Sequence, residues 1–131
     1  EYTAYVFVDC RVAGFLLDTE LRVASDRVKV TRAALPAGYR IERKFKPIAD
    51  TVASPRLDGV VAALCNLSRE AAKEKIVAGE VEHNYEIAAR TDAAIAAGDV
   101  LSVRGVGKFE VESVSDPTRK GRFRLIARKY I

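Results

Sequence analysis

The sequence predicts an α+β fold, in which a partial β-α-β unit is followed by a second module of two helices, a small antiparallel sheet and a basic C-terminal hairpin. Helical spacing of apolar residues in two neighbouring segments, and alternation of apolar and charged residues after them, predict this order. The 131 residues suffice for one ordinary domain or two small ones, and 49% apolar with 31% charged residues is typical of a folded, soluble protein. This composition excludes a disordered or fibrous chain.

Residues 1–49 are predicted to form the β-α-β segment and a connector. The aromatic and β-branched run from Tyr2 to Val8 predicts a strand, and Asp9 can cap a helix that follows at once. Apolar residues then recur near helical spacing from Val12, and a short alternating run around Val28 predicts a second strand. The basic run at 40–46 lies among prolines and predicts a connector. Several apolar residues in this connector can pack on the structured segment before it or after it.

The module predicted for residues 50–131 begins with two short helices. Apolar residues from Leu57 to Cys65 follow at i, i+3, i+4, i+7 and i+8, which is the pattern of an amphipathic helix. Asn66 ends it, Ser68 is a good N-cap for a second helix, and Gly79 can adopt the left-handed conformation that ends that helix.

Strands are expected after the second helix. Residues 80–87 predict one strand, 88–98 a loop with a short strand, and 100–104 a further strand. The segments 108–114 and 122–130 both alternate apolar and charged residues, which predicts a final hairpin.

The basic residues are concentrated near the end of the chain. The net charge is +4, yet residues 57–103 carry 4 basic and 8 acidic side chains, whereas residues 104–131 carry 8 basic and 3 acidic. Such a distribution suits a polyanion, although a solvated surface strand explains the charge equally well.

Cysteines and the single histidine, His83, favour neither a metal site nor a disulfide. Cys10 and Cys65 lie 55 positions apart in apolar contexts that are typical of reduced, buried thiols, so we expect a reducing cytoplasm. We expect no metal and no cofactor. No stretch approaches the roughly 18 apolar residues needed to cross a bilayer, and no leader precedes the first predicted strand.

One face of the second helix carries the first candidate site. Arg69 and Lys73 are four residues apart and project from the same side, next to Ser68 at the helix N-terminus. Two fixed positive charges and the free amides of a helix start can together hold phosphate groups.

Several spaced motifs in residues 50–131 together resemble the S4 RNA-binding domain. They are Arg56-Leu57-Asp58, Leu67-Ser68-Arg69 with Ala72, Ile76 and Gly79, and then Val81, Asn84 and Gly98-Asp99. The segments 50–54, 102–108 and 118–122 are similar to the YlmH-type branch of that family. His83 departs from the family, in which an apolar strand residue is usual.

The resemblance implies a non-enzymatic protein that binds structured rRNA or tRNA on the large ribosomal subunit, in the rescue of stalled translation. It also implies that the chain lacks the amino-terminal region of a full-length relative. The alternative function, of a different class, is a protein-interaction module linked to cell division. The sequence predicts no particular oligomeric state. The expected RNA-binding residues are Arg56, Ser68, Arg69, Lys73, Asn84, Arg104, Lys108, Arg119, Lys120 and Arg122.

For three features of the sequence, a functional interpretation competes with a structural one. Arg-Leu-Asp is also the nucleophile motif of pseudouridine synthases, but Gly59 and Val60 follow it here, so we assign Asp58 to offsetting the helix dipole and Arg56 to phosphate. The Gly-Val-Gly at 105–107 lacks the rest of a dinucleotide fingerprint and predicts a bulge or close backbone approach. Tyr85 and Phe109 can stack on bases, although strand aromatics are more often core.

Overall fold

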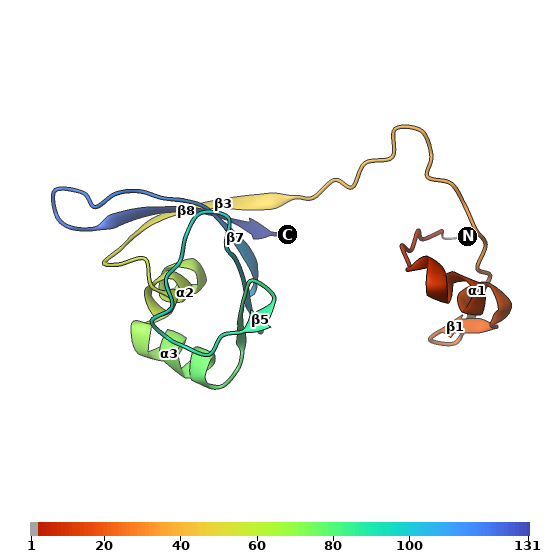
Figure 1. Ribbon diagram of the computed structural model, residues 1–131, viewed down its shortest axis with the longest axis horizontal. Helices are drawn as coiled ribbons and strands as arrows, with labels where there is room; N and C mark the ends of the chain where they lie inside the picture. Colours follow the sequence, from red (N-terminus) through yellow and green to blue (C-terminus); the bar gives the residue numbers. More distant parts are fainter. Residues whose placement is uncertain (1–2) are drawn as a thin grey trace. The chain divides into compact units, whose positions relative to one another are not determined.

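The chain consists of two compact units, residues 1–41 and residues 42–131. The computed structural model describes residues 3–131, and each unit is taken by itself below (Figure 1). No helix within residues 3–131 is long and apolar enough to cross a membrane.

Unit 1 is a helix followed by a hairpin, not the predicted β-α-β segment. Helix α1 (Cys10–Asp18) begins as expected at Asp9, whose carboxylate accepts a hydrogen bond from the Arg11 amide at 2.8 Å. Strands β1 (Leu21–Val23) and β2 (Asp26–Val28) pair only with each other. Residues 3–8 form no strand, because they stay exposed and pair with neither β1 nor β2, and residue 2 of the predicted strand lies outside the described residues.

Little of the side-chain surface of unit 1 is buried. None of its residues from 3 to 41 is fully buried, and Cys10 is exposed rather than buried as its apolar context predicted. An apolar pattern predicts burial only where a second layer exists to pack against.

Unit 2 contains a six-stranded antiparallel sheet with the order β3-β8-β7-β6-β4-β5. Its helices lie on the same side of β3 and β8 in Figure 1. The elements are β3 (Phe45–Val52), α2 (Leu57–Cys65), α3 (Arg69–Val77), β4 (Val81–His83), β5 (Glu86–Ile87), β6 (Val100–Val103), β7 (Gly107–Val114) and β8 (Phe123–Tyr130).

Strand β3 replaces the end of the predicted connector. It pairs along its whole length with β8, from Phe45 opposite Tyr130 to Val52 opposite Phe123. A division of the chain at 49/50 therefore cuts through this strand, which the prolines and the basic run concealed in the sequence. The pairing partner lies more than 70 residues away, so no local pattern identifies it.

The predicted strand at 80–87 is a tight hairpin. Asn84 and Tyr85 occupy its two-residue turn with φ of 51° and 70°, between β4 and β5. A primed turn with both residues at positive φ usually has glycine or asparagine there. Because Tyr85 departs from this preference, the sequence did not predict the turn. The short strand expected within 88–98 is reduced to an isolated bridge between Ala94 and Arg56.

Both predicted helices of unit 2 are confirmed. Asn66 takes the left-handed conformation at the end of α2, and the Ser68 hydroxyl accepts a hydrogen bond from the Ala71 amide at the start of α3. Gly79 follows α3 with φ of +73°, which is the conformation that a glycine at this place allows.

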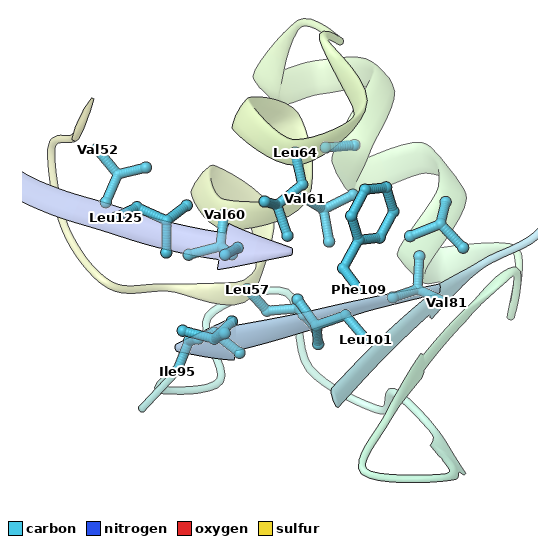
Figure 2. Close-up of a cluster of buried hydrophobic side chains, with 14 of the residues drawn as sticks. Val52, Leu57, Val60, Val61, Leu64, Val81, Ile95, Leu101, Phe109 and Leu125 are labelled. Atoms are coloured by element: carbon cyan, nitrogen blue, oxygen red, sulfur yellow. The ribbon is translucent and has the colours of Figure 1, made fainter. Parts of the chain in front are cut away.

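The core of unit 2 lies between α2, α3 and one face of the sheet. Leu57, Val60 and Val61 of α2 are fully buried against strand residues that include Leu101 and Phe109 (Figure 2). Each fully buried side chain of this size contributes about 1.5–3 kcal/mol. Phe109 is thus a core residue, which rules out its stacking on bases.

We expect unit 2 to fold without unit 1, provided that β3 is kept. Removing residues 1–41 should leave one cooperative thermal transition, whereas removing residues 1–50 deletes most of β3 and its ladder with β8. The loss of strand hydrogen bonds and apolar burial should cost about 2 kcal/mol or more, equivalent to a melting temperature roughly 10 °C lower. Calorimetry on both truncations measures the difference, and equal melting temperatures would show that β3 adds nothing.

Candidate nucleic-acid interface

A buried carboxylate joins the two helices of unit 2. Asp58 lies in the first turn of α2 with no exposed surface. Its Oδ1 accepts a hydrogen bond from the Gly59 amide at 2.8 Å, and its Oδ2 accepts bonds from Arg56 Nη2 and Arg69 Nε, each at 3.2 Å. The assignment of Asp58 to the helix dipole alone was therefore incomplete, because the residue mainly anchors two arginines.

The surroundings of Asp58 lower its pKa. Burial by itself raises the pKa of this carboxyl, but the Arg69 and Gly59 hydrogen bonds and the charges of Arg69 and Arg56 lower it below its ordinary value of 3.8. The carboxylate is therefore ionised throughout the neutral range.

The ion pair orients two of the predicted RNA-binding side chains. Arg56 and Arg69 keep 41% and 44% of their side-chain surface exposed while they bind Asp58. The cluster of two cations and one carboxylate carries a net positive charge. Each guanidinium has five N–H donors, so further donors remain for an external anion.

A hollow of about 370 Å³ places Arg69 beside Arg122. Thr51 of β3 and Asn66 and Leu67 of the turn between the helices also line it. Arg122 donates from Nη2 to the Thr51 carbonyl oxygen at 2.8 Å and from Nε to the Thr51 hydroxyl at 3.1 Å. Asp50 lines the hollow as well. Two arginines that are far apart in sequence thus line one polar depression together with a carboxylate, and their guanidinium groups can bind a phosphate group there.

Four other predicted residues, Ser68, Lys73, Arg119 and Lys120, do not line this hollow. Lys73 on α3 forms a weak ion pair with Glu70 at 3.3 Å, and the Ser68 hydroxyl is used by the helix cap. Arg119 and Lys120 are exposed in the turn between β7 and β8.

Arg104 and Lys108 line a second hollow, of about 540 Å³, at the turn between β6 and β7. Glu80 and Glu82 line it as well, so its charge is mixed. At Gly107, with φ of +144°, a Cβ atom would lie 2.7 Å from Lys129 Cε, which agrees with the close approach expected of the Gly-Val-Gly segment.

The side chain of Asn84 has a structural role in the β4–β5 hairpin. Its side-chain amide donates to Asp99 Oδ1 at 3.1 Å, and its amide oxygen accepts from the Val100 backbone at 2.9 Å. His83 Nε2 lies 2.9 Å from the other Asp99 oxygen. These contacts connect the β4–β5 hairpin to the segment before β6.

Sequence analysis named Lys108 and Tyr85 but missed Phe45, Arg128 and Tyr130 on the uncovered face of the sheet. Phe45 and Tyr130 lie opposite each other on β3 and β8, and Arg128 approaches the Phe45 ring to 4.1 Å. The alternation within β8 indicated two faces, but only the pairing with β3 brings Phe45 to this one.

Part of this chain is similar in sequence to a curated protein. The chain is 33% identical over 76 residues to the "Ribosome-associated protein quality control protein P2" of Bacillus subtilis (strain 168). The match covers 58% of this chain, which spans about 30% of the length of that relative. No protein-family model matches the chain. The name of that relative describes association with the ribosome, and the S4 domain stays a prediction for this chain.

The buried ion pair predicts the cost of neutralising Asp58. Asp58→Asn keeps the side-chain size but removes the charge that faces Arg56 and Arg69. Breaking a fully buried pair costs about 3–5 kcal/mol, and because both arginines are partly solvated we expect about 2 kcal/mol in the free energy of unfolding. Urea denaturation at pH 7 measures it. Asp92→Asn, which breaks the exposed Arg90–Asp92 pair, is the matched control and should change stability much less.

The same variant predicts a pH dependence. Because the folded-state pKa of Asp58 is lowered, its carboxylate stabilises the fold fully above the ordinary pKa of 3.8 and loses that effect as the pH falls through the lowered value. The stability difference between wild type and Asp58→Asn should therefore be constant from pH 7 to about pH 5 and shrink below about pH 4. A difference that grew toward acid pH would contradict the ion-pair assignment.

Proposed function

We propose that this protein binds structured RNA, rRNA or tRNA on the large ribosomal subunit, through the helix side of unit 2. The observation that carries the proposal is the hollow in which Arg69 and Arg122 meet between α2, α3 and β3. Folded RNA is recognised mainly through shape and backbone contacts, and arginines held in fixed positions suit that task.

The electrostatics of the surrounding surface support the proposal. Lys73 lies on α3 four residues after Arg69, and the exposed Arg119 and Lys120 precede Arg122 in the β7–β8 turn, so each adds a charge near in sequence to an arginine of the hollow. The ion pair with Asp58 holds Arg69 in place before RNA arrives, so less side-chain entropy is lost on binding.

The similarity to a ribosome-associated protein supports the choice of partner. It favours a role in ribosome-associated quality control, as that relative's name describes, over the cell-division alternative. No contact within residues 3–131 favours an acidic protein partner specifically.

A catalytic role for Asp58 gains no support from its geometry. A nucleophile must reach its substrate, whereas this carboxylate is fully buried and hydrogen bonded to Arg56, Arg69 and Gly59. We therefore keep the proposal of a non-enzymatic binding protein that needs no cofactor.

Salt dependence of RNA affinity tests the proposed interface. With about 4–6 phosphate contacts and roughly 0.7 per contact, the slope of log K against log salt should be about −3 to −4. Lys73→Ala combined with Lys120→Ala removes one helix charge and one turn charge, and should make the slope shallower by about 1.4. Fluorescence anisotropy with a labelled RNA hairpin at several salt concentrations measures these slopes.

The choice of variants avoids the Asp58 cluster. Arg69→Ala would remove charge and also leave Asp58 short of a partner, so lost binding could reflect lost stability. Lys75→Ala is the matched control, because Lys75 lies on the same helix but is held by Glu80 at 2.7 Å. Equal weakening by Lys75→Ala and the double change would show that the face is misassigned, and a salt-independent affinity would contradict the proposal.

A further inference from the structure

The sheet of unit 2 has one face without helices, and aromatic rings and cations gather on it. Along β8, Leu125 and Ala127 are buried in the core, whereas Arg128 and Tyr130 are turned to the opposite side and stay partly exposed. We define the aromatic–cation patch as Arg43, Phe45, Tyr85, Lys108, Arg128 and Tyr130.

Rings and cations alternate across this patch. The Phe45 and Tyr130 rings meet edge to face with centroids 4.9 Å apart, and the Arg128 guanidinium lies 4.1 Å from the Phe45 centroid. Lys108 Nζ lies 5.1 Å from the Tyr130 centroid and 4.8 Å from that of Tyr85. The pattern joins residues from β3, β7, β8 and the β4–β5 turn into one surface.

The patch carries free positive charge. Arg128 pairs with two carboxylates, Glu110 at 2.8 Å and Glu112 at 3.6 Å, and Glu110 also accepts a hydrogen bond from the Tyr130 hydroxyl at 3.2 Å, so the charge of Arg128 is offset. Within residues 3–131, Lys108 and Arg43 form no ion pair, and both lie against aromatic rings of the patch. A ligand for this surface is therefore anionic and has flat groups that can lie on aromatic rings.

Tyr85 does not serve the fold. It occupies a left-handed position, φ 70°, in a turn where glycine is the favoured residue, and 70% of its surface is exposed. A bulky side chain at positive φ costs stability, and here no burial compensates for that cost. Strained residues of this kind gather at functional sites.

We propose that the aromatic–cation patch binds a single-stranded segment of RNA, with bases stacked on Tyr85 and Tyr130 and phosphates held by Lys108 and Arg43. This inference rests on the proposed RNA-binding function and deepens it. The helix side holds the folded part of the RNA, and the sheet face holds unpaired nucleotides next to it.

The chemistry of single strands fits this surface. Proteins that bind them combine a cationic track with exposed rings, because every base has a face that can stack. Stacking of a base on an aromatic ring is stronger than an exposed cation–π contact, so a base can displace Lys108 from the Tyr85 ring and leave its ammonium group free for phosphate.

Two labelled RNAs test the proposal with the full chain. One is a hairpin with a single-stranded tail of six uridines, and the other is the same hairpin without the tail. Wild type should bind the tailed RNA about 25-fold tighter or more, the gain expected from stacking of two bases. Tyr85→Gly should lower this gain about fivefold and leave the affinity for the blunt hairpin unchanged. Because glycine suits the turn, the melting temperature of this variant should be equal or higher.

Two further variants separate the ring from general surface effects. Tyr85→Phe keeps the ring and should keep the gain. Val77→Ala shortens an apolar side chain that is 81% exposed on α3, and should also keep it.

Each failure has a distinct meaning. This inference would be overturned if the tail adds no affinity, or if Tyr85→Gly leaves the affinity gain from the tail undiminished. In either case, salt-dependent binding of the blunt hairpin would still uphold the proposed function. Failure of both RNAs to bind would overturn the proposed function itself. Dimers in sedimentation experiments, together with a missing tail effect, would assign the patch to a second copy of the chain and overturn its assignment to RNA.

Discussion

The ion pair of Asp58 with Arg56 and Arg69 determines how the helix side of unit 2 is arranged. Burial of a carboxylate is expensive unless its oxygens are paired, so the fold must bring both arginines to the start of α2. The pair connects α2 to α3 and fixes one guanidinium at the edge of the polar hollow. The shape of the candidate interface is thus a consequence of satisfying one buried charge.

The pairing of β3 with β8 has a similar role for the other side of the sheet. Because side chains alternate along a strand, the register that buries Leu125 and Ala127 also turns Arg128 and Tyr130 away from the helices. Unit 2 therefore has two positively charged sides of different character. One presents arginines held by hydrogen bonds, and the other presents rings and mobile cations.

Local patterns predicted the local structure well. Helical spacing between Leu57 and Cys65, the Ser68 cap and the Gly79 stop located α2 and α3, and alternation located β6, β7 and β8. These elements satisfy their own backbone hydrogen bonds or those of a neighbour in sequence, so their signals lie within a few residues.

The missed features depend on distant partners. Strand β3 exists because it pairs with β8, more than 70 residues later, whereas residues 3–8 have no strand partner within the described residues. The sequence identified Arg69 and Arg122 as basic, but not that they share a hollow or that Asp58 holds one of them. Residue type predicted which groups can bind phosphate, and only the tertiary structure indicates which of them act together.

Crosslinking of RNA to the protein in cells, followed by sequencing of the attached RNA, tests directly whether unit 2 binds RNA. If it does, crosslinked reads should concentrate at a few structured positions of rRNA or tRNA, above the level of a sample that was not crosslinked. RNA recovery no higher than in that control would contradict the claim that unit 2 is an RNA-binding module.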